Sequence, residues 1–198
     1  PAPPPGRDAA AGRPGGHSLF NNVAVAVRHL RERRGLARVL VVDWGARAPR
    51  GTGQVLAHDR GVRVLSVHQH PVPALVPPDS GEPSGAAPPH LHAVEVAPGP
   101  DGAGFGAALA RGLEEATVRW KPAFVLLSLG LDVLAGDPMG GLAVQPRDVH
   151  DLTLQVREAA DRACDGRLVS VLEGGYDAAA TGKAVVQHLR ALAGLPPA

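Results

Sequence analysis

The sequence has little of three things that whole classes of protein require: cysteine, net charge and long apolar runs. Its one cysteine, Cys164, excludes a disulfide framework and a cysteine-based zinc cluster. The formal net charge of +1 gives no electrostatic argument for binding nucleic acid or an anionic membrane. No apolar run approaches the roughly 20 residues that a membrane span needs. We therefore expect an intracellular protein of a reducing compartment, its organelle not indicated, with no nucleic-acid partner and no membrane span.

Aromatic residues are also scarce, at 3% of the 198 residues. The hydrophobic core must therefore be built mainly from valine, leucine and alanine. The hydrophobic share of 44% and the charged share of 20% are typical of a folded globular chain. The length suits one α/β domain with a substantial core.

Apolar runs and helical patterns alternate along the chain. We expect strands at 37–43, 62–67, 91–96, 123–129 and 167–172. We expect helices from Asn22 to a stop at Gly35, and at 52–58, 104–120, 146–163 and 181–192, with Pro146 in the first turn of its helix. This alternation predicts a mostly parallel sheet with helices on both faces. In such sheets the ligand site forms at the carboxyl ends of the strands.

Two segments interrupt this pattern. Residues 1–16 are rich in proline, glycine and alanine, which predicts an irregular lead-in to a domain at 17–198. Residues 68–89 form a long, proline-rich loop, and loops of this length in compact domains are functional or flexible. The chain lacks an initiator methionine, so we expect it to be a piece of something longer.

Four stretches carry a resemblance to one enzyme family. Residues 16–26 resemble the Gly-Phe-Cys-x-Phe-Asn-Asn-Val-Ala-x-Ala segment of histone deacetylases and acetylpolyamine amidohydrolases. Residues 38–44 resemble the strand that leads into the family's Asp-Trp-Asp-Val-His-His-Gly metal motif. Residues 129–142 and 172–177 resemble the family's last metal loop and its tyrosine loop. The order and spacing agree over essentially the whole chain.

The resemblance implies an arginase/deacetylase-like three-layer α/β sandwich in which the family's N-terminal elements, roughly a third of the usual domain, are missing. Family members are zinc-dependent amidohydrolases whose zinc is held by two aspartates and one histidine. A histidine pair handles the proton transfers, and a tyrosine hydroxyl stabilises the oxyanion.

Matched to the metal motif, this chain departs from the family at two of the three zinc ligands. Residues 43–49 read Asp-Trp-Gly-Ala-Arg-Ala-Pro. Asp43 matches an aspartate that in the family lies behind the zinc ligands. Gly45 stands in place of the first zinc-binding carboxylate, and Arg47, which cannot bind a metal, stands in place of the imidazole. Asp132 matches the third ligand. One carboxylate does not hold a catalytic zinc, so the resemblance here implies no cofactor.

The proton-transfer residues depart as well. The family's Pro-Gly-His-His-Ala falls on residues 5–9, which places Arg7 and Asp8 where the histidine pair would be. Tyr176 remains as a vestigial oxyanion residue. It and Asp132 persist either because their loops pack well or because they still bind a ligand. The resemblance also outlines a pocket, lined by Asp43, Arg47, His17, Gly130, Gly174 and Gly175.

Several histidines leave a second interpretation open. His90 and His92 alternate on an expected strand and so point to one face, where they offer replacement metal ligands near Asp132. His68 and His70 follow another strand end, and we expect His68 to be structural.

We conclude from the sequence that the chain is a catalytically inactive deacetylase-like domain, a structural or binding module in a larger protein or assembly. Its expected partner is another protein or the missing N-terminal part of the same domain. The alternative is a zinc-dependent amidohydrolase that deacetylates acetyl-lysine or acetylpolyamines with replacement ligands. For the inactive domain we predict that the Arg47 guanidinium bonds Asp132 or Asp43 in place of a metal, the alternative being that Arg47 points into solvent.

Overall fold

Five strands form one parallel sheet at the centre of the fold. The structure, a computed structural model, describes residues 6–16, 18–70, 90–118 and 120–198. The strands are β1 (Val39–Gly45), β2 (Val62–Gln69), β3 (Leu91–Val96), β4 (Phe124–Gly130) and β5 (Leu168–Gly174). Their order in the sheet is β3-β2-β1-β4-β5, and every pairing is parallel. All carboxyl ends therefore meet at one edge, as predicted.

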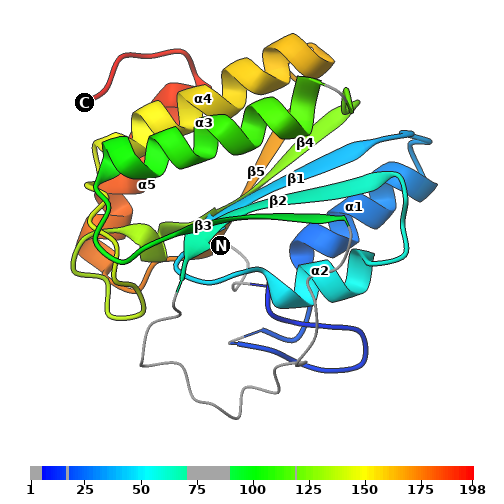
Figure 1. The fold of residues 1–198 in the computed structure, drawn as a ribbon, viewed down its shortest axis with the longest axis horizontal. Helices are drawn as coiled ribbons and strands as arrows, with labels where there is room; N and C mark the ends of the chain where they lie inside the picture. The colour runs from blue at the N-terminus through cyan, green and yellow to red at the C-terminus, as the bar shows by residue number, and fades with distance from the viewer. Residues whose placement is uncertain (1–5, 17, 71–89, 119) are drawn as a thin grey trace.

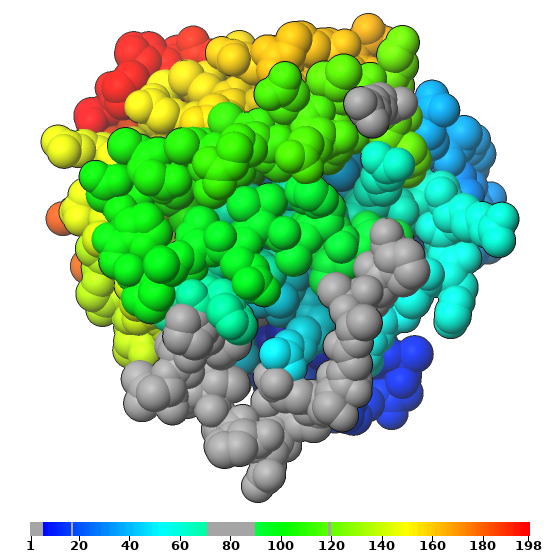
Figure 2. Space-filling view, viewed as in Figure 1, coloured from blue at the N-terminus to red at the C-terminus, as the bar shows by residue number. Residues whose placement is uncertain are grey.

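Helices cover both faces of this sheet, which gives three layers (Figure 1). The helices α1 (Asn22–Glu32) and α2 (Arg50–Leu56) lie on one face. The helices α3 (Gly102–Val118), α4 (Asp148–Cys164) and α5 (Ala178–Leu192) lie on the other. Figure 2 shows α3, in green, running across that second face with α4, in yellow to orange, beside it. The α/β fold expected from the sequence is confirmed.

The central strand β1 explains how the two layers of core arise. All seven of its residues are buried, as suits a strand covered on both sides. Because side chains alternate along a strand, Leu40, Val42 and Trp44 pack into the core under α3 and α4. Val39 and Val41 pack into the core under α1. Asp43 and Gly45 follow Val39 and Val41 at the same spacing of two, so they lie on the face of the sheet that α1 and α2 cover.

The predicted elements all occur, and their ends differ by a few residues. The strand β3 has the predicted bounds, whereas α5 begins at Ala178 instead of residue 181. The Asp177 carboxylate accepts hydrogen bonds from the Ala179 and Ala180 amides and so starts α5 one turn earlier. Pro146 lies before α4, which begins at Asp148, so its predicted place inside the helix was wrong.

Among the described helices, none is long and apolar enough to cross a membrane. The long loop was predicted at 68–89, but residues 68 and 69 still belong to β2. Residues 71–89 lie outside the described residues. The sheet ends at β3 on one side and at β5 on the other, where Val169 is 48% exposed.

Candidate functional site

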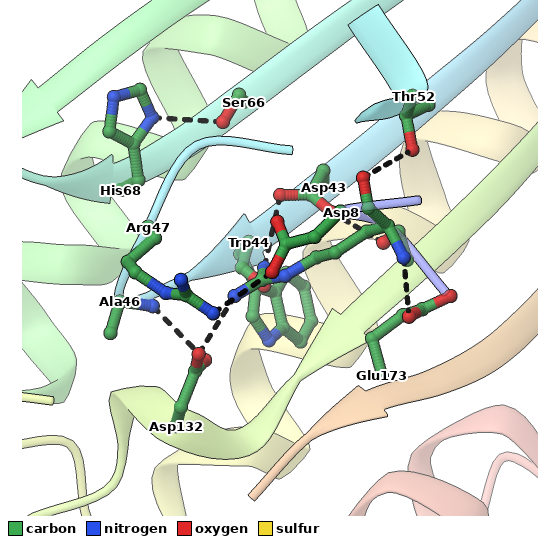
Figure 3. Close-up of polar contacts among 12 residues, drawn as sticks. Asp8, Asp43, Trp44, Ala46, Arg47, Thr52, Ser66, His68, Asp132 and Glu173 are labelled. Carbon is green, nitrogen blue, oxygen red and sulfur yellow. Dashed lines mark hydrogen bonds and ion pairs between the residues drawn. The ribbon is translucent and has the colours of Figure 1, made fainter. Parts of the chain in front are cut away.

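Three acidic side chains meet below the carboxyl ends of β1, β4 and β5. Asp43 lies near the end of β1, Asp132 in the short 3₁₀ turn Leu131–Val133 directly after β4, and Glu173 near the end of β5. All three are buried, with exposed fractions of 0%, 1% and 3%. Figure 3 shows the carboxylates of Asp43 and Asp132 facing the same region, with Glu173 to one side. Because an uncompensated buried carboxylate costs several kcal/mol, such a cluster needs a cation or hydrogen-bond donors.

Arg7 provides the cation. Its Nη2 lies 2.7 Å from Oδ2 of Asp132, and its Nη1 lies 3.3 Å from Oδ1 of Asp43. The same Nη1 donates a hydrogen bond of 3.2 Å to the carbonyl oxygen of Trp44. The guanidinium is only 4% exposed, so these bonds form out of contact with bulk water. Arg7 thus joins the ends of β1 and β4 through one buried charge.

The backbone around Arg7 is held as firmly as its side chain. The Arg7 amide donates to Oε2 of Glu173 at 3.0 Å, and the Gly6 amide donates to the same oxygen. The Arg7 carbonyl accepts from the backbone amide of Thr52 at 3.0 Å. The Asn21 side-chain amide donates to the carbonyl of Ala9 at 3.0 Å. Residues 6–9 therefore pack into the domain as a fixed turn, which we call the N-terminal turn.

The second carboxylate oxygen of each aspartate also accepts a hydrogen bond. The Ala46 amide donates to Oδ1 of Asp132 at 3.0 Å, and the Ser128 hydroxyl donates to Oδ2 of Asp43. Ser128 is the register partner of Asp43 on β4. Burial raises the pKa of Asp43 to about 7, although Arg7 and the Ser128 hydroxyl act to lower it. Burial opposes the charge of Arg7, but the carboxylates of Asp132 and Asp43 outweigh it and raise the pKa of the guanidinium.

Gly45 makes room for this arrangement. A Cβ atom at position 45 would lie 2.5 Å from Cζ of Arg7 and closer still to both of its Nη atoms. Asp43 and Gly45 lie two residues apart on one strand, so their side chains point the same way. The guanidinium therefore occupies the space that a side chain at residue 45 would take.

The prediction for Arg47 was wrong. Its guanidinium bonds neither Asp132 nor Asp43, and it does not point freely into solvent. Its Nη2 pairs instead with Oδ2 of Asp8 at 2.9 Å, and the two side chains are 19% and 22% exposed. Asp8 and Arg7 are neighbours in the chain, so the N-terminal turn carries one charge inward to the aspartates and one outward to Arg47.

Tyr176 lies beside this cluster, half-buried, and burial raises the pKa of its phenol. Its backbone amide donates to Oδ2 of Asp137 at 2.7 Å, while Oδ1 of Asp137 accepts from the Met139 amide. Asp137 therefore binds both its own loop and the tyrosine loop. A cavity of about 10 Å³, room for one water molecule, remains near Tyr176. It is lined by Arg7, Asp8, Gly15, Ser18, Arg47, Glu173, Gly174 and Tyr176.

The predicted pocket residues are only partly brought together. Gly130 and Gly174 pack against Asp132, since a Cβ at either position would lie 2.8–3.2 Å from its carboxylate oxygens. Gly175 has a φ of 122°, which favours glycine, and it leads into Tyr176. His17 lies outside the described residues.

The histidines of the alternative interpretation lie elsewhere. His90 precedes β3, and His92 pairs with Leu65 in the middle of β2. The strands β2 and β1 lie between β3 and β4, the strand that leads to Asp132. His92 contacts Glu115 of α3 at 3.0 Å. His68 is buried at the end of β2 and bonds the Ser66 hydroxyl at 2.9 Å, and burial lowers its pKa to about 4. Within residues 6–16, 18–70, 90–118 and 120–198, no three His, Cys, Asp or Glu side chains are grouped as metal ligands would be.

A zinc ion does not fit the residues around Asp43 and Asp132. A catalytic zinc takes three protein ligands from imidazole, thiolate or carboxylate groups. Here residue 45 has no side chain, Arg47 is a cation, and Arg7 already lies between the two aspartates. A second cation placed there would be repelled by the guanidinium. The arrangement neutralises two carboxylates and leaves no open position for a metal-bound water.

The all-parallel sheet with helices on both faces is the α/β architecture of the arginase/deacetylase class. The sequence model described as "Histone deacetylase domain" matches residues 2–192, and this chain belongs to that family. The match begins before Arg7 and so includes the whole N-terminal turn.

Three relatives illustrate the similarity. The chain is 32% identical to "Histone deacetylase 10, chloroplastic" of Oryza sativa subsp. japonica over 98% of this chain and 44% of that protein. It is 31% identical to a "Probable deacetylase" of Archaeoglobus fulgidus over 87% of this chain and 48% of that protein. It is 32% identical to a "Histone deacetylase-like amidohydrolase" of Pseudomonas aeruginosa over 94% of this chain and 50% of that protein. The chain therefore spans half or less of the length of these relatives.

Sequence reasoning found the two aspartates and missed what binds them. It placed Arg7 at a lost histidine, without the ion pairs, and it did not single out Glu173, Thr52 or Ser128. The sequence indicates the position of the Arg7 guanidinium only when two residues are considered together. A glycine at residue 45 leaves a space, and an arginine stands where the family carries an inward-facing imidazole.

Proposed function

We propose that this chain is a catalytically inactive histone-deacetylase-like domain that serves as a structural or binding module in a larger protein or assembly. The observation that carries the proposal is the Arg7 guanidinium between Asp43 and Asp132. Gly45 and Arg47 stand where the resemblance places two zinc ligands. Without a metal to polarise an acetyl carbonyl, Tyr176 has no developing oxyanion to stabilise.

The purified chain is expected to bind far less than one zinc ion and to hydrolyse no acetyl-lysine peptide above the buffer blank. The measurement is elemental analysis after dialysis against zinc and then buffer, with the peptide assay on the same sample. An active deacetylase purified in parallel shows that the procedure retains zinc. One zinc ion per chain that is lost in Asp132→Ala, together with peptide hydrolysis, would contradict the proposal and support the amidohydrolase alternative.

The surface beside the N-terminal turn supports the binding role. Leu19, Phe20 and Val25 are 74%, 73% and 60% exposed, and they line one groove of about 490 Å³ between residues 10–14 and α1. Large apolar side chains gathered at one place on a surface are typical of protein contacts.

Changing Leu19 and Phe20 together to serine is expected to shift the free energy of unfolding by no more than about 0.5 kcal/mol. The reason is that both side chains are exposed, so little packing is lost. The variant should also bind less of a hydrophobic fluorescent dye than the parent chain. Leu134→Ser, at a position 1% exposed, is the matched control and is expected to unfold the domain. A large stability loss in the double variant would show that the two side chains belong to the core.

A further inference from the structure

We infer that Arg7 and Gly45 form a matched pair in which the guanidinium is the resident cation of the site and Gly45 is the residue that admits it. The inference concerns what fills the site, so it stands apart from whether the domain binds a partner. It assigns a role to two positions that the resemblance describes only as losses.

The first support is the geometry of the charge. Arg7 is the one cation that contacts both Asp43 and Asp132 among the ion pairs of the described residues. Each terminal nitrogen faces a different aspartate, and a planar guanidinium is suited to hold two oxygens in fixed directions. The Arg7 main chain is fixed by Glu173 and Thr52, so the side chain enters from a rigid base.

The second support is the exclusion of a side chain at residue 45. The backbone of Gly45 is not among those with positive φ in the described chain, so its conformation suits an alanine. The obstacle to any larger residue is therefore the guanidinium itself. Arg7 is long and could swing away from a new Cβ, but it would then leave two buried carboxylates without their cation.

These two facts make the positions mutually dependent. With Arg7 in place, residue 45 must be glycine. With a side chain at residue 45, the guanidinium cannot lie between the aspartates. A site with the guanidinium between the aspartates can therefore become a site with a side chain at residue 45 only when residues 7 and 45 both change.

A double-mutant cycle tests this dependence, using the full chain and its thermal unfolding midpoint. Gly45→Ala alone is expected to lower the midpoint by roughly 5–10 °C, because it displaces the guanidinium. In an Arg7→Ala background the same change is expected to shift the midpoint by less than about 3 °C. The control is Gly112→Ala, whose Cβ would clash with the Leu65 side chain in the core under α3 and not with Arg7 or its aspartates. Its effect is expected to be the same in both backgrounds. Equal effects of Gly45→Ala in both backgrounds would overturn the inference.

Chemical rescue provides a second measurement in case Gly45→Ala does not fold. Millimolar methylguanidinium chloride is expected to raise the midpoint of Arg7→Ala, because the free cation can enter the space between the aspartates. Potassium chloride at the same concentration is the ionic-strength control. The parent chain, whose site is filled, should not respond. If Arg7→Ala responds equally to both salts, the space does not bind a guanidinium and the inference is wrong. Zinc content does not enter either measurement, so a failure here is distinct from a failure of the proposed function.

Discussion

Replacing Arg7 by alanine is expected to lower the free energy of unfolding by about 3–5 kcal/mol. Removing one partner of a buried ion pair leaves the other charge unpaired, and here two carboxylates share the same cation. Urea unfolding followed by circular dichroism measures the loss. Arg7→Met, which keeps most of the side-chain volume without the charge, is expected to lose a similar amount. A near-normal Arg7→Met would mean that packing, and not charge, is what Arg7 contributes.

Arg47→Ala is the matched control for this prediction. Arg47 also pairs with an aspartate, but both partners are partly exposed, so the loss is expected to stay near 1 kcal/mol. Adding Asp132→Asn to Arg7→Ala should recover part of the stability, because it removes one of the unpaired charges. If Arg7→Ala and Arg47→Ala lower the free energy of unfolding equally, the buried ion pairs of Arg7 do not stabilise the fold more than the partly exposed pair of Arg47.

Lowering the pH from 6.5 to about 4 is expected to remove about 3 kcal/mol of unfolding free energy through His188 alone. Burial lowers the pKa of His188 from 6.5 to about 4. The Thr153 hydroxyl donates to the Val149 carbonyl, so it can only accept from Nδ1 of the neutral ring. Between the two pKa values the unfolded chain takes up a proton that the folded chain does not, so stability is full above pH 6.5 and falls as the pH falls.

Unfolding free energies measured across this pH range test the prediction. His188→Asn, which keeps a donor near Nδ1 and does not titrate, is expected to flatten part of the slope. The slope of the parent chain also contains a contribution of the same sign from His68 and contributions of opposite sign from Asp43 and Glu173, whose pKa values burial raises. The test is therefore the difference in slope between the parent chain and His188→Asn. An unaltered slope in His188→Asn would show that this histidine accepts a proton in the folded state.

The order and kind of every helix and strand followed from the sequence because each depends on nearby residues. The unbroken aliphatic run before Asp43 predicts a strand buried on both faces, and β1 is such a strand. The expectation that Asp43 and Asp132 share one site came from the resemblance, and the parallel sheet agrees with it because such a sheet brings strand ends to one edge. The early start of α5 depends on one capping carboxylate, Asp177, which the apolar spacing of the helix does not indicate. The division of the chain at residue 16 stays a prediction.

The choice between Arg7 and Arg47 could not be made from local sequence. Arg47 leaves the same strand end as Asp43, which favoured it, but a residue's direction after a strand depends on what packs against it. Here Asp8 lies on the outer side and pairs with Arg47. Asp8 belongs to a stretch of proline, glycine and alanine whose path no periodicity describes. Contacts between such a stretch and three strand ends are set by the assembled fold.

The N-terminal turn also has a consequence for the order in which the chain can fold. Its bond to Asp132 joins residues 125 positions apart, and its bonds to Glu173 span 166 and 167 positions. Contacts of such separation form late, because the intervening chain must first be ordered. During synthesis, β1 can pair with β2 long before β5 leaves the ribosome, while Arg7 has no complete binding place until β5 is present. We therefore expect the first turn of this chain to be among the last parts of the domain to reach its native position.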